Sequence, residues 1–386
     1  MNIEKMPENV TFHYPDDASE EYKSKIQAKV LENLVGGLDV ESLSSLDNEI
    51  IKEQWQIEAI RKINNITKQY FKAKFNFNIR DLTPDDIHIL KPKDMVEVLK
   101  EMGKYNGEVP RGLSMNRHML LSTEITEVAQ PKLEFIKGII HELLHTNEFK
   151  KMTEIKIRTG MNEYKIVSAM REGVSMRKPD KFQSEWRFQG LSEGITEMFS
   201  KEVLHQVVSS DPAYQKEVDD KFSNVFKKVS REELIGVMGL RSYDVIDVDV
   251  VNRKDGGKKY SWYLSGTYLE EQELIFFVAA NIARVKSDKY KSINEVMDLF
   301  FNAQYKGELL PLGREVDEIF GPGTFRLLSA IPAEHSNIIA MNTIKFLKLP
   351  LEQRDPKIAE TFIFTSHNKA DYKKYLSANK DIKSTN

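Results

Sequence analysis

The chain has 386 residues, and its 56 Lys and Arg nearly balance its 59 Asp and Glu, which gives a formal net charge of −3. It contains no Cys, so disulfides, thiolate metal sites and cysteine nucleophiles are excluded, and any transition metal must be bound by His and carboxylates. The hydrophobic share of 40% argues against global disorder, and the balanced charge gives no reason to expect nucleic-acid binding. A chain of this length is expected to form two or three packed units.

The N-terminal residues, Met1 to Asn9, lack the apolar segment of a secretory signal peptide. The longest apolar run, at 274–283, is too short for a bilayer, because a spanning helix needs about 20 residues. We therefore expect no integral membrane segment, and a protein that is cytoplasmic or exported without a signal peptide.

Helices are expected to dominate the first third of the chain. Residues 1–18 are polar and predict loose chain, whereas apolar residues recur at helical spacing between Leu43 and Ile60. The elements expected here are helices at 19–35 and 42–74, a strand at 86–90, a helix at 92–102 and a strand within 113–125.

Two hairpins are expected to interrupt the helices of the remaining chain. Pro131 suits the first turn of a helix over 131–149. The turn sequences Thr159-Gly160-Met161-Asn162 and Asp255-Gly256-Gly257 predict hairpins at 154–168 and 243–263, with a loop from the first hairpin to about 188. Further helices are expected at 189–208 and between 266 and 347, followed by a polar tail. Strands that interrupt helices, without alternating with them, indicate a helix-dominated α+β fold.

The predicted helix over 131–149 contains the segment Gly138-Ile139-Ile140-His141-Glu142-Leu143-Leu144-His145. Two His at i and i+4 project from one helix face and can bind one zinc ion at Zn–N distances of ~2.0–2.1 Å. Glu142 lies about 100° around the helix, where it can hydrogen-bond a water at the ion and act as general base. Gly138 would leave room for another segment or a substrate. The alternative is a buried helix with two ordinary core His residues.

A catalytic zinc site needs a third protein ligand and an open fourth position. The metzincin pattern would place Gly and His where Glu148 and Lys151 stand, so it is excluded. The segment 190–199 predicts a second helix with Glu193 and Glu197 at i and i+4 among apolar neighbours. Glu193 would bind the metal, and Glu197 would accept the outer N–H of a zinc-bound His. A solvated helix face is the alternative for such a pair.

These two segments together resemble the gluzincin branch of the HExxH zinc metallopeptidases, the zincins. Leu191-Ser192-Glu193-Gly194 is similar to the L-N-E-G opening of the second helix in that family. The resemblance implies His141, His145 and Glu193 as zinc ligands, Glu142 as base and Glu197 as hydrogen-bond partner of a ligand. It also implies a zincin-like core, in which a small mixed sheet and the active-site helix precede a helical C-terminal subdomain. The 48 residues from His145 to Glu193 exceed the family's usual spacing, so the hairpin and loop between them read as an insertion, and no subfamily is assigned.

A third segment, Tyr263-Leu264-Ser265-Gly266, stands before the helix expected from residue 269. It resembles the Y-x-x-G element of aminopeptidase-type gluzincins, whose Tyr helps to stabilise the oxyanion. The resemblance therefore implies a catalytic role for Tyr263. A packed aromatic at the end of a hairpin is the alternative, and Tyr260 and Tyr268 are rival candidates.

The resemblance also suggests how the chain is organised. Met115 to Thr123 is expected to form an edge strand that pairs with extended substrate backbone. The regions expected are a helical N-terminal region at 1–80, an upper subdomain with the sheet, the His helix and the inserted hairpin at 81–188, a lower, mostly helical subdomain at 189–350, and a polar tail at 351–386.

The sequence thus predicts a zinc-dependent metallopeptidase that hydrolyses peptide bonds in a peptide or protein substrate. Two alternatives stay open. One is an effector or toxin protease of the zincin type with a single protein substrate, and the other is a non-catalytic scaffold that binds zinc.

Overall fold

The structure is a computed structural model of the whole chain. It describes the residues of fifteen stretches: 10–14, 18–25, 27, 44–101, 105, 107, 109–115, 118–125, 131–158, 164–179, 184–217, 245–252, 258–265, 268–331 and 336–350. The expected C-terminal tail at 351–386 and most of the expected helix at 19–35 lie outside them.

The described elements form a helix-dominated α+β fold, as predicted, with a small mixed sheet. Two compact units are present, and each is discontinuous along the chain. The first unit comprises residues 1–25, 148–197 and 268–386, and the second comprises 26–147 and 198–267. The boundary after residue 197 falls inside the single helix α5 (Gln189–Ser209).

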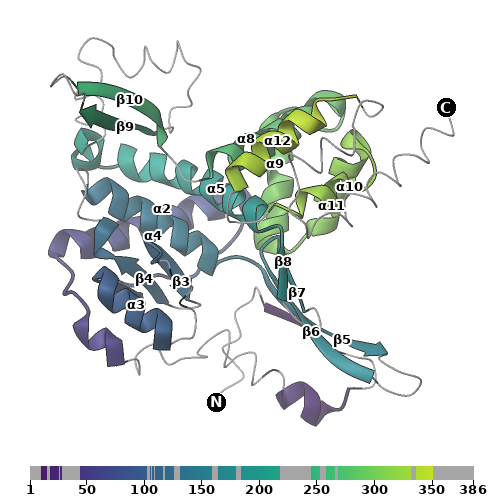
Figure 1. The fold of residues 1–386 in the computed structure, drawn as a ribbon, viewed down its shortest axis with the longest axis horizontal. Coiled ribbons are helices and arrows are strands. Elements are labelled where there is room, and N and C mark those ends of the chain that lie inside the picture. The colour runs from purple at the N-terminus through teal and green to yellow at the C-terminus, as the bar shows by residue number, and fades with distance from the viewer. Residues whose placement is uncertain are drawn as a thin grey trace. The chain divides into compact units, whose positions relative to one another are not determined.

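The second unit is built around a three-stranded sheet in the order β2-β4-β3 (Figure 1). Strand β2 (Ile87–Leu90) pairs parallel with β4 (His118–Ser122), and β3 (Gly112–Met115) pairs antiparallel with β4. Helices α3 (Pro92–Glu101) and α4 (Pro131–Thr146) lie on opposite sides of this sheet. The strand at 86–90 and the helices at 92–102 and 131–149 are therefore confirmed to within a few residues.

The expected edge strand is wrong in its position. The apolar run of Met115 to Thr123 supplies the central strand β4, whose neighbours are β2 and β3. The outer strands are β2 and β3, and the sequence analysis did not separate β3 from β4. The continuous run of buried residues in β4, from Met119 to Ser122, shows that both faces of this strand are covered. The outer strand β2 is buried in the same way, so such a run identifies a buried strand but not its place in the sheet.

The helix expected at 42–74 is confirmed from residue 54 onward, but its first part is wrong. The structure has a 3₁₀ turn, η3 (Ser44–Asn48), then extended chain, then α2 (Gln54–Phe75). The break is set by tertiary and capping contacts: the Ile50 amide donates to the Ile89 carbonyl at 2.9 Å, and Glu53 forms a reciprocal capping box with Gln56.

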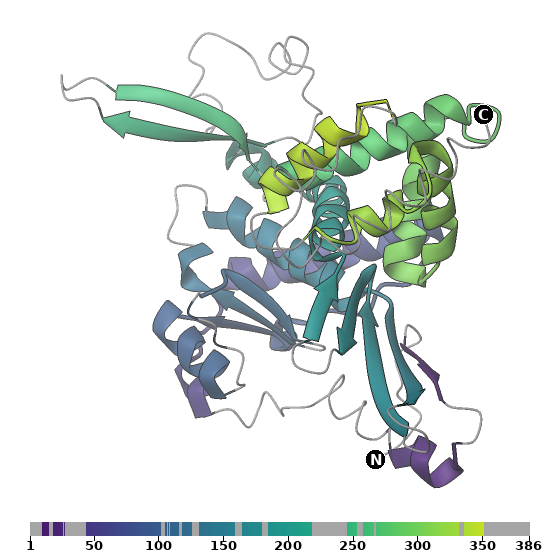
Figure 2. The ribbon, with the colours of Figure 1, turned by 45° about the vertical axis from the view of Figure 1, so that its right-hand side comes forward.

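The first unit contains a five-stranded sheet in the order β1-β5-β6-β7-β8, shown with its long β5–β6 hairpin in Figure 2. The hairpin expected at 154–168 is confirmed and is longer, since β5 is Lys150–Arg158 and β6 is Tyr164–Glu172. The predicted loop up to 188 is instead two more strands, β7 (Ser175–Pro179) and β8 (Ser184–Arg187). The loose chain expected at 1–18 includes a strand, β1 (Val10–His13), which pairs parallel with β5.

The helices of the first unit confirm the helical region expected at 266–347. A π-helical turn, η6 (Asn302–Lys306), directly follows α9. The helices are α8 (Leu269–Val285), α9 (Ile293–Phe301), α10 (Leu309–Phe320), α11 (Thr324–Leu328) and α12 (Ser336–Leu347).

The remaining elements of the second unit include the second expected hairpin, which is confirmed as β9 (Val245–Asn252) and β10 (Lys258–Ser265). Two short 3₁₀ turns, η4 (Pro84–Asp86) and η5 (Thr123–Ile125), flank the small sheet. In the described part of the chain, no helix combines the length and apolar character that crossing a membrane requires.

Candidate metal centre

Helix α4 is held at both ends by side chains of its own unit. Near its start, the Leu133 amide donates to the Glu217 carboxylate at 3.1 Å, which satisfies one of the unpaired N–H groups of a first helical turn. After its end, the Asn147 side-chain amide donates to the Leu143 carbonyl at 2.7 Å, and its oxygen accepts from the Arg80 amide at 2.8 Å. These contacts fix the axis and the length of the helix that carries the predicted metal ligands.

The two His side chains emerge where the apolar face of α4 ends. The apolar residues of the helix are buried, whereas His141 and His145 are half-buried. Their Nε2 atoms lie 3.0 Å apart, and the ring planes meet at 74°. Two imidazoles bound to one tetrahedral zinc at ~2.0–2.1 Å would place these nitrogens roughly 3.3 Å apart. The pair therefore has a spacing that suits shared metal ligation with almost no rearrangement.

Glu193 of α5 completes a group of three side chains that could hold a metal ion. One ligand atom each from His141, His145 and Glu193 lies within 4.8 Å of the others, and all three residues are half-buried. Among the described residues this is the only such group. A His2Glu donor set suits Zn²⁺ and leaves a fourth position for water or substrate.

The first turn of α5 is anchored before it reaches Glu193. Phe188 adopts a left-handed conformation with φ +62°, and its amide donates to the Ser329 carbonyl at 2.7 Å. The Gly190 amide donates to the Ile331 carbonyl at 3.1 Å. These bonds satisfy backbone donors at the helix start and fix where the helix begins.

Gly194, the residue after the predicted ligand Glu193, lies where the helix packs closely against a neighbour. A Cβ atom at this position would lie 2.8 Å from the Glu271 Cβ and 2.9 Å from the Ile275 Cδ1, both on α8. The absence of a side chain thus lets α5 pack closely against α8, and Glu193 is held on a helix with a fixed neighbour.

The predicted base, Glu142, is buried against an outer strand of the small sheet. Only 9% of its surface is exposed, and a Cβ atom on Gly112 of β3 would lie 2.8 Å from its Oε1. The carboxylate therefore contacts the strand backbone at a place where no side chain fits. Sequence analysis did not identify Gly112, because nothing in the chain pattern links it to a residue 30 positions later.

The space at Gly138 is taken by another segment and not by a substrate. A Cβ atom at Gly138 would lie 3.2 Å from Ile125 Cδ1 and 3.9 Å from Leu121 Cδ2. Gly138 therefore allows α4 to pack closely on the small sheet.

The roles of all these residues stay predictions, and so do those of Glu197 and Tyr263. Glu197 is buried at 6% exposure one turn after Glu193, but it is not a member of the metal-ligand group. Tyr263 lies in β10 opposite Asp247, and its side chain is outside the described part of the structure, as is that of Tyr260. The third candidate, Tyr268, has φ +59° and precedes α8.

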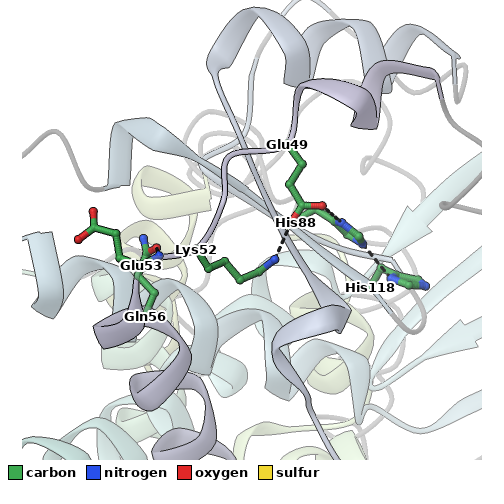
Figure 3. A network of polar contacts seen from close by, with 6 residues as sticks. All are labelled: Glu49, Lys52, Glu53, Gln56, His88 and His118. Carbon is green, nitrogen blue, oxygen red and sulfur yellow. Dashed lines mark hydrogen bonds and ion pairs between the residues drawn. The ribbon is translucent and has the colours of Figure 1, made fainter.

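A second pair of His residues was not expected from the sequence. His88 of β2 receives a contact on each ring nitrogen: Nδ1 lies 2.7 Å from Glu49 Oε2, and Nε2 lies 3.0 Å from Nδ1 of His118 (Figure 3). Lys52 donates to the same Glu49 carboxylate at 2.5 Å. No short spacing connects these residues in the chain, so only the pairing of the strands brings them together.

This polar chain lies on the sheet face opposite the predicted metal ligands. Side chains alternate along a strand, and His88 is in register with Leu120, which packs in a cluster with residues of α3. Gly112 and Leu121 face α4 from the other side. His88 and His118 therefore attach η3 and its following segment to the sheet and are not part of the α4 site.

Comparisons with known proteins gave no match: no family model, no curated protein and no solved structure is similar to the chain. The candidate site is therefore assessed from its residues and geometry alone.

We expect the purified protein to bind one equivalent of zinc and His141→Ala to lose it, because the remaining His and Glu would leave the ion with two protein ligands. His118→Ala is the matched control, since it also removes one member of a His pair at 3.0 Å but on the other sheet face. Metal analysis after dialysis measures both. A full equivalent of zinc in His141→Ala would refute the ligand assignment.

Glu49 should contribute stability that depends on pH. Burial raises the pKa of Glu49, but hydrogen bonds from His88 and Lys52 outweigh this effect and leave the pKa below its ordinary value of 4.5. The contribution is therefore present above that value and is lost as the pH falls through the lower, folded pKa. We expect Glu49→Gln to lower the free energy of unfolding by about 1 kcal/mol at pH 7, with a smaller difference from wild type below pH ~4.

Chemical denaturation between pH 3 and pH 7 measures this difference. Glu97→Gln is the control, because Glu97 pairs with Lys100 in a contact where both side chains are more than half exposed. An equal pH dependence in the two variants would show that the contacts of Glu49 do not carry the effect.

Proposed function

We propose that the protein is a zinc-dependent metallopeptidase of the zincin type, which hydrolyses peptide bonds by Glu142-assisted attack of water. One observation carries the proposal: ligand atoms of His141, His145 and Glu193 lie within 4.8 Å of one another, and Glu142 follows the first of them on the same helix. A purely structural zinc site has four protein ligands and needs no base, whereas this group has three.

The chemistry of the donor set supports Zn²⁺ as the cofactor. When bound, zinc supplies Lewis-acid chemistry, lowering the pKa of water toward ~7 and polarising a carbonyl oxygen. Imidazole and carboxylate suit this ion, and the chain has no thiolate to compete for it.

Glu142 is the group that moves protons in this proposal. Its carboxylate takes a proton from the attacking water and passes it to the leaving amine, so that one residue serves as base and then as acid. Its position against the β3 backbone restricts the side chain to few conformations. A restricted carboxylate loses little entropy when the reacting groups come together, which is how orientation contributes to rate.

The surrounding elements support a zincin-like core in a coarse way. In the second unit, a small mixed sheet packs on α4. In the first unit, helices α8 to α12 form most of the C-terminal part. The substrate would be a peptide or a protein, and Tyr263 is the candidate donor to the oxyanion on the strength of the sequence resemblance alone.

We expect Glu142→Gln to reduce hydrolysis of a peptide library by at least a hundredfold while one equivalent of zinc stays bound. The amide keeps the size of the side chain but cannot accept a proton at neutral pH. Mass spectrometry of the digest, together with metal analysis of each protein, measures both quantities.

His141→Ala is the control for this experiment, since it should remove activity and zinc together. Equal cleavage by wild type and Glu142→Gln would assign any observed hydrolysis to a contaminant or to another site. Zinc binding without any hydrolysis, of the library or of whole protein substrates, would overturn the proposed activity and favour a scaffold.

Gly112→Ala should impair the proposed base without affecting zinc binding. Its Cβ would lie 2.8 Å from Glu142 Oε1 and 3.1 Å from Glu142 Cγ, so the carboxylate must move. Since displacement of a reacting group by about 1 Å costs up to 10²-fold in rate, we expect a ten- to hundredfold lower kcat with unchanged zinc content.

Steady-state kinetics on a cleaved library peptide measures the effect of Gly112→Ala. Gly138→Ala is the matched control, because its Cβ would meet Ile125 at 3.2 Å and does not meet the base. If both variants keep the wild-type kcat, the Glu142 carboxylate acts from another position or not at all.

A further inference from the structure

A fully buried glutamine lies in the π-helical turn of the first unit. Gln304 is 0% exposed and belongs to η6, which continues α9 and ends at Gly307 in a left-handed conformation of φ +79°. π-helical turns are rare and occur frequently at functional sites. The main-chain carbonyl of Gln304 accepts from the Phe149 amide at 3.0 Å. The side chain of Gln304 is therefore directed into the protein interior by a π-helical backbone, and this backbone is hydrogen-bonded to the segment at Phe149.

The side-chain amide of Gln304 has a complete set of partners. Its Nε2 lies 2.7 Å from Glu148 Oε1, 2.9 Å from Ser192 Oγ and 3.2 Å from Thr196 Oγ1. Its Oε1 accepts from the Val174 amide at 3.0 Å. The Val174 amide can only donate, so the oxygen must face it and the nitrogen must face the Glu148 carboxylate. The orientation of the amide group is thus determined by its surroundings.

Two of these partners belong to the helix that carries the predicted metal ligand. Ser192 and Thr196 are one turn apart on α5, and Glu193 and Glu197 each follow by one residue, about 100° around the helix. An amide that binds Ser192 and Thr196 therefore sets the rotation of the helical turn that presents Glu193. Gly194, packed against α8, constrains the same turn from another direction.

The third partner is Glu148, and losing its hydrogen bond with Gln304 would be strongly destabilising. Its side chain is buried at 5% exposure, and it accepts from Thr196 as well as from Gln304. A buried carboxylate that loses a hydrogen-bond donor is strongly destabilised, so its neighbours must shift to provide another one. Thr196 is the neighbour on α5, and the shift would therefore affect the ligand helix.

We propose that Gln304 is a positioning residue for the metal: its amide fixes the rotation of α5 and thereby aims Glu193 at the ion. The inference rests on the proposed metal site and adds to it a residue more than a hundred positions away in the chain. Gly173 belongs to the same arrangement, since a Cβ atom there would lie 2.6 Å from Gln304 Oε1.

Arg171 offers a matched control on the same turn. Its guanidinium donates to the carbonyls of Gly173, Ala303 and Gly307 at 2.8–2.9 Å. Burial lowers the pKa of Arg171 to about 10, so its guanidinium is partly desolvated but still charged at neutral pH. It holds η6 as Gln304 does, but none of these three acceptors belongs to α5.

The experiment compares zinc affinity in Gln304→Met, Arg171→Met, Glu193→Ala and the double variant Gln304→Met/Glu193→Ala, by competition with a chromophoric chelator. We expect Gln304→Met to weaken zinc binding ten- to a hundredfold, as loss of a supporting hydrogen bond does at metal sites. Arg171→Met should lower the melting temperature but change zinc affinity less than threefold. In the Glu193→Ala background, Gln304→Met should have almost no further effect on affinity, because its target is gone.

The outcomes separate this inference from the proposed function. Stoichiometric zinc in wild type with unchanged affinity in Gln304→Met, or an equal loss with and without Glu193, would overturn the inference alone. No zinc binding by wild type would overturn the proposed function and the inference with it. If Gln304→Met does not fold, Ser192→Ala replaces it, since it removes one acceptor on α5 and leaves Glu148 paired, and the same comparison with and without Glu193 decides.

Discussion

The burial of α5 is the constraint on which the candidate site depends. Of residues 190–201, all are buried except Glu193 and Met198, which are half-buried. The polar side chains of a helix enclosed on all sides are withdrawn from water, so their hydrogen bonds have to come from inside the protein. Ser192 and Thr196 find theirs in Gln304, whereas Glu193 forms the candidate metal-binding group with the two His of α4.

The unusual backbone around η6 follows from the same requirement. A regular α-helix continued from α9 would distribute its side chains at 100° intervals, whereas the wider π turn changes the direction in which residue 304 points. Arg171 stabilises the turn by donating to the carbonyl of Ala303 within it and to that of Gly307 directly after it, and Gly173 leaves the space that the glutamine occupies. Three separate stretches of the chain thus contribute to presenting one short turn of α5.

Local periodicity was sufficient to predict the elements that carry the ligands. His141 and His145 repeat at i and i+4, as do Glu193 and Glu197, and both helices are present within a few residues of the predicted bounds. The contacts that depend on the order of the strands could not be predicted from the sequence. An outer strand was assigned to Met115–Thr123, although β2 and β3 occupy the outer positions, because an apolar run identifies a strand but not its place in the sheet.

The contacts of the polar residues were missed for a related reason. His88 and His118 are 30 residues apart and meet only because β2 and β4 are parallel neighbours. Likewise, Gly112 approaches Glu142 and Gln304 approaches Ser192 across long stretches of sequence. Glycine carries no side-chain pattern that could have revealed the first contact, and a single glutamine in a helical region predicts a solvated position. Sequence reasoning therefore finds candidate ligands, whose spacing is local, more readily than the residues that contact their helices from distant parts of the chain.

This division has a consequence for how such a site can change. The proposed ligands depend on helical spacing within α4 and α5, whereas the proposed base lies against β3 and the turn that carries Glu193 is bound by Gln304 of η6. A substitution in β3 acts on the base without touching a ligand, and one in η6 acts on a ligand without touching the base. In the proposed site, metal binding and proton transfer would then depend on different parts of the fold, although Glu142 and His141 are adjacent in the chain. A substitution in one part of the fold could therefore impair proton transfer or metal binding separately. The H-E-x-x-H spacing alone does not determine whether a protein has both.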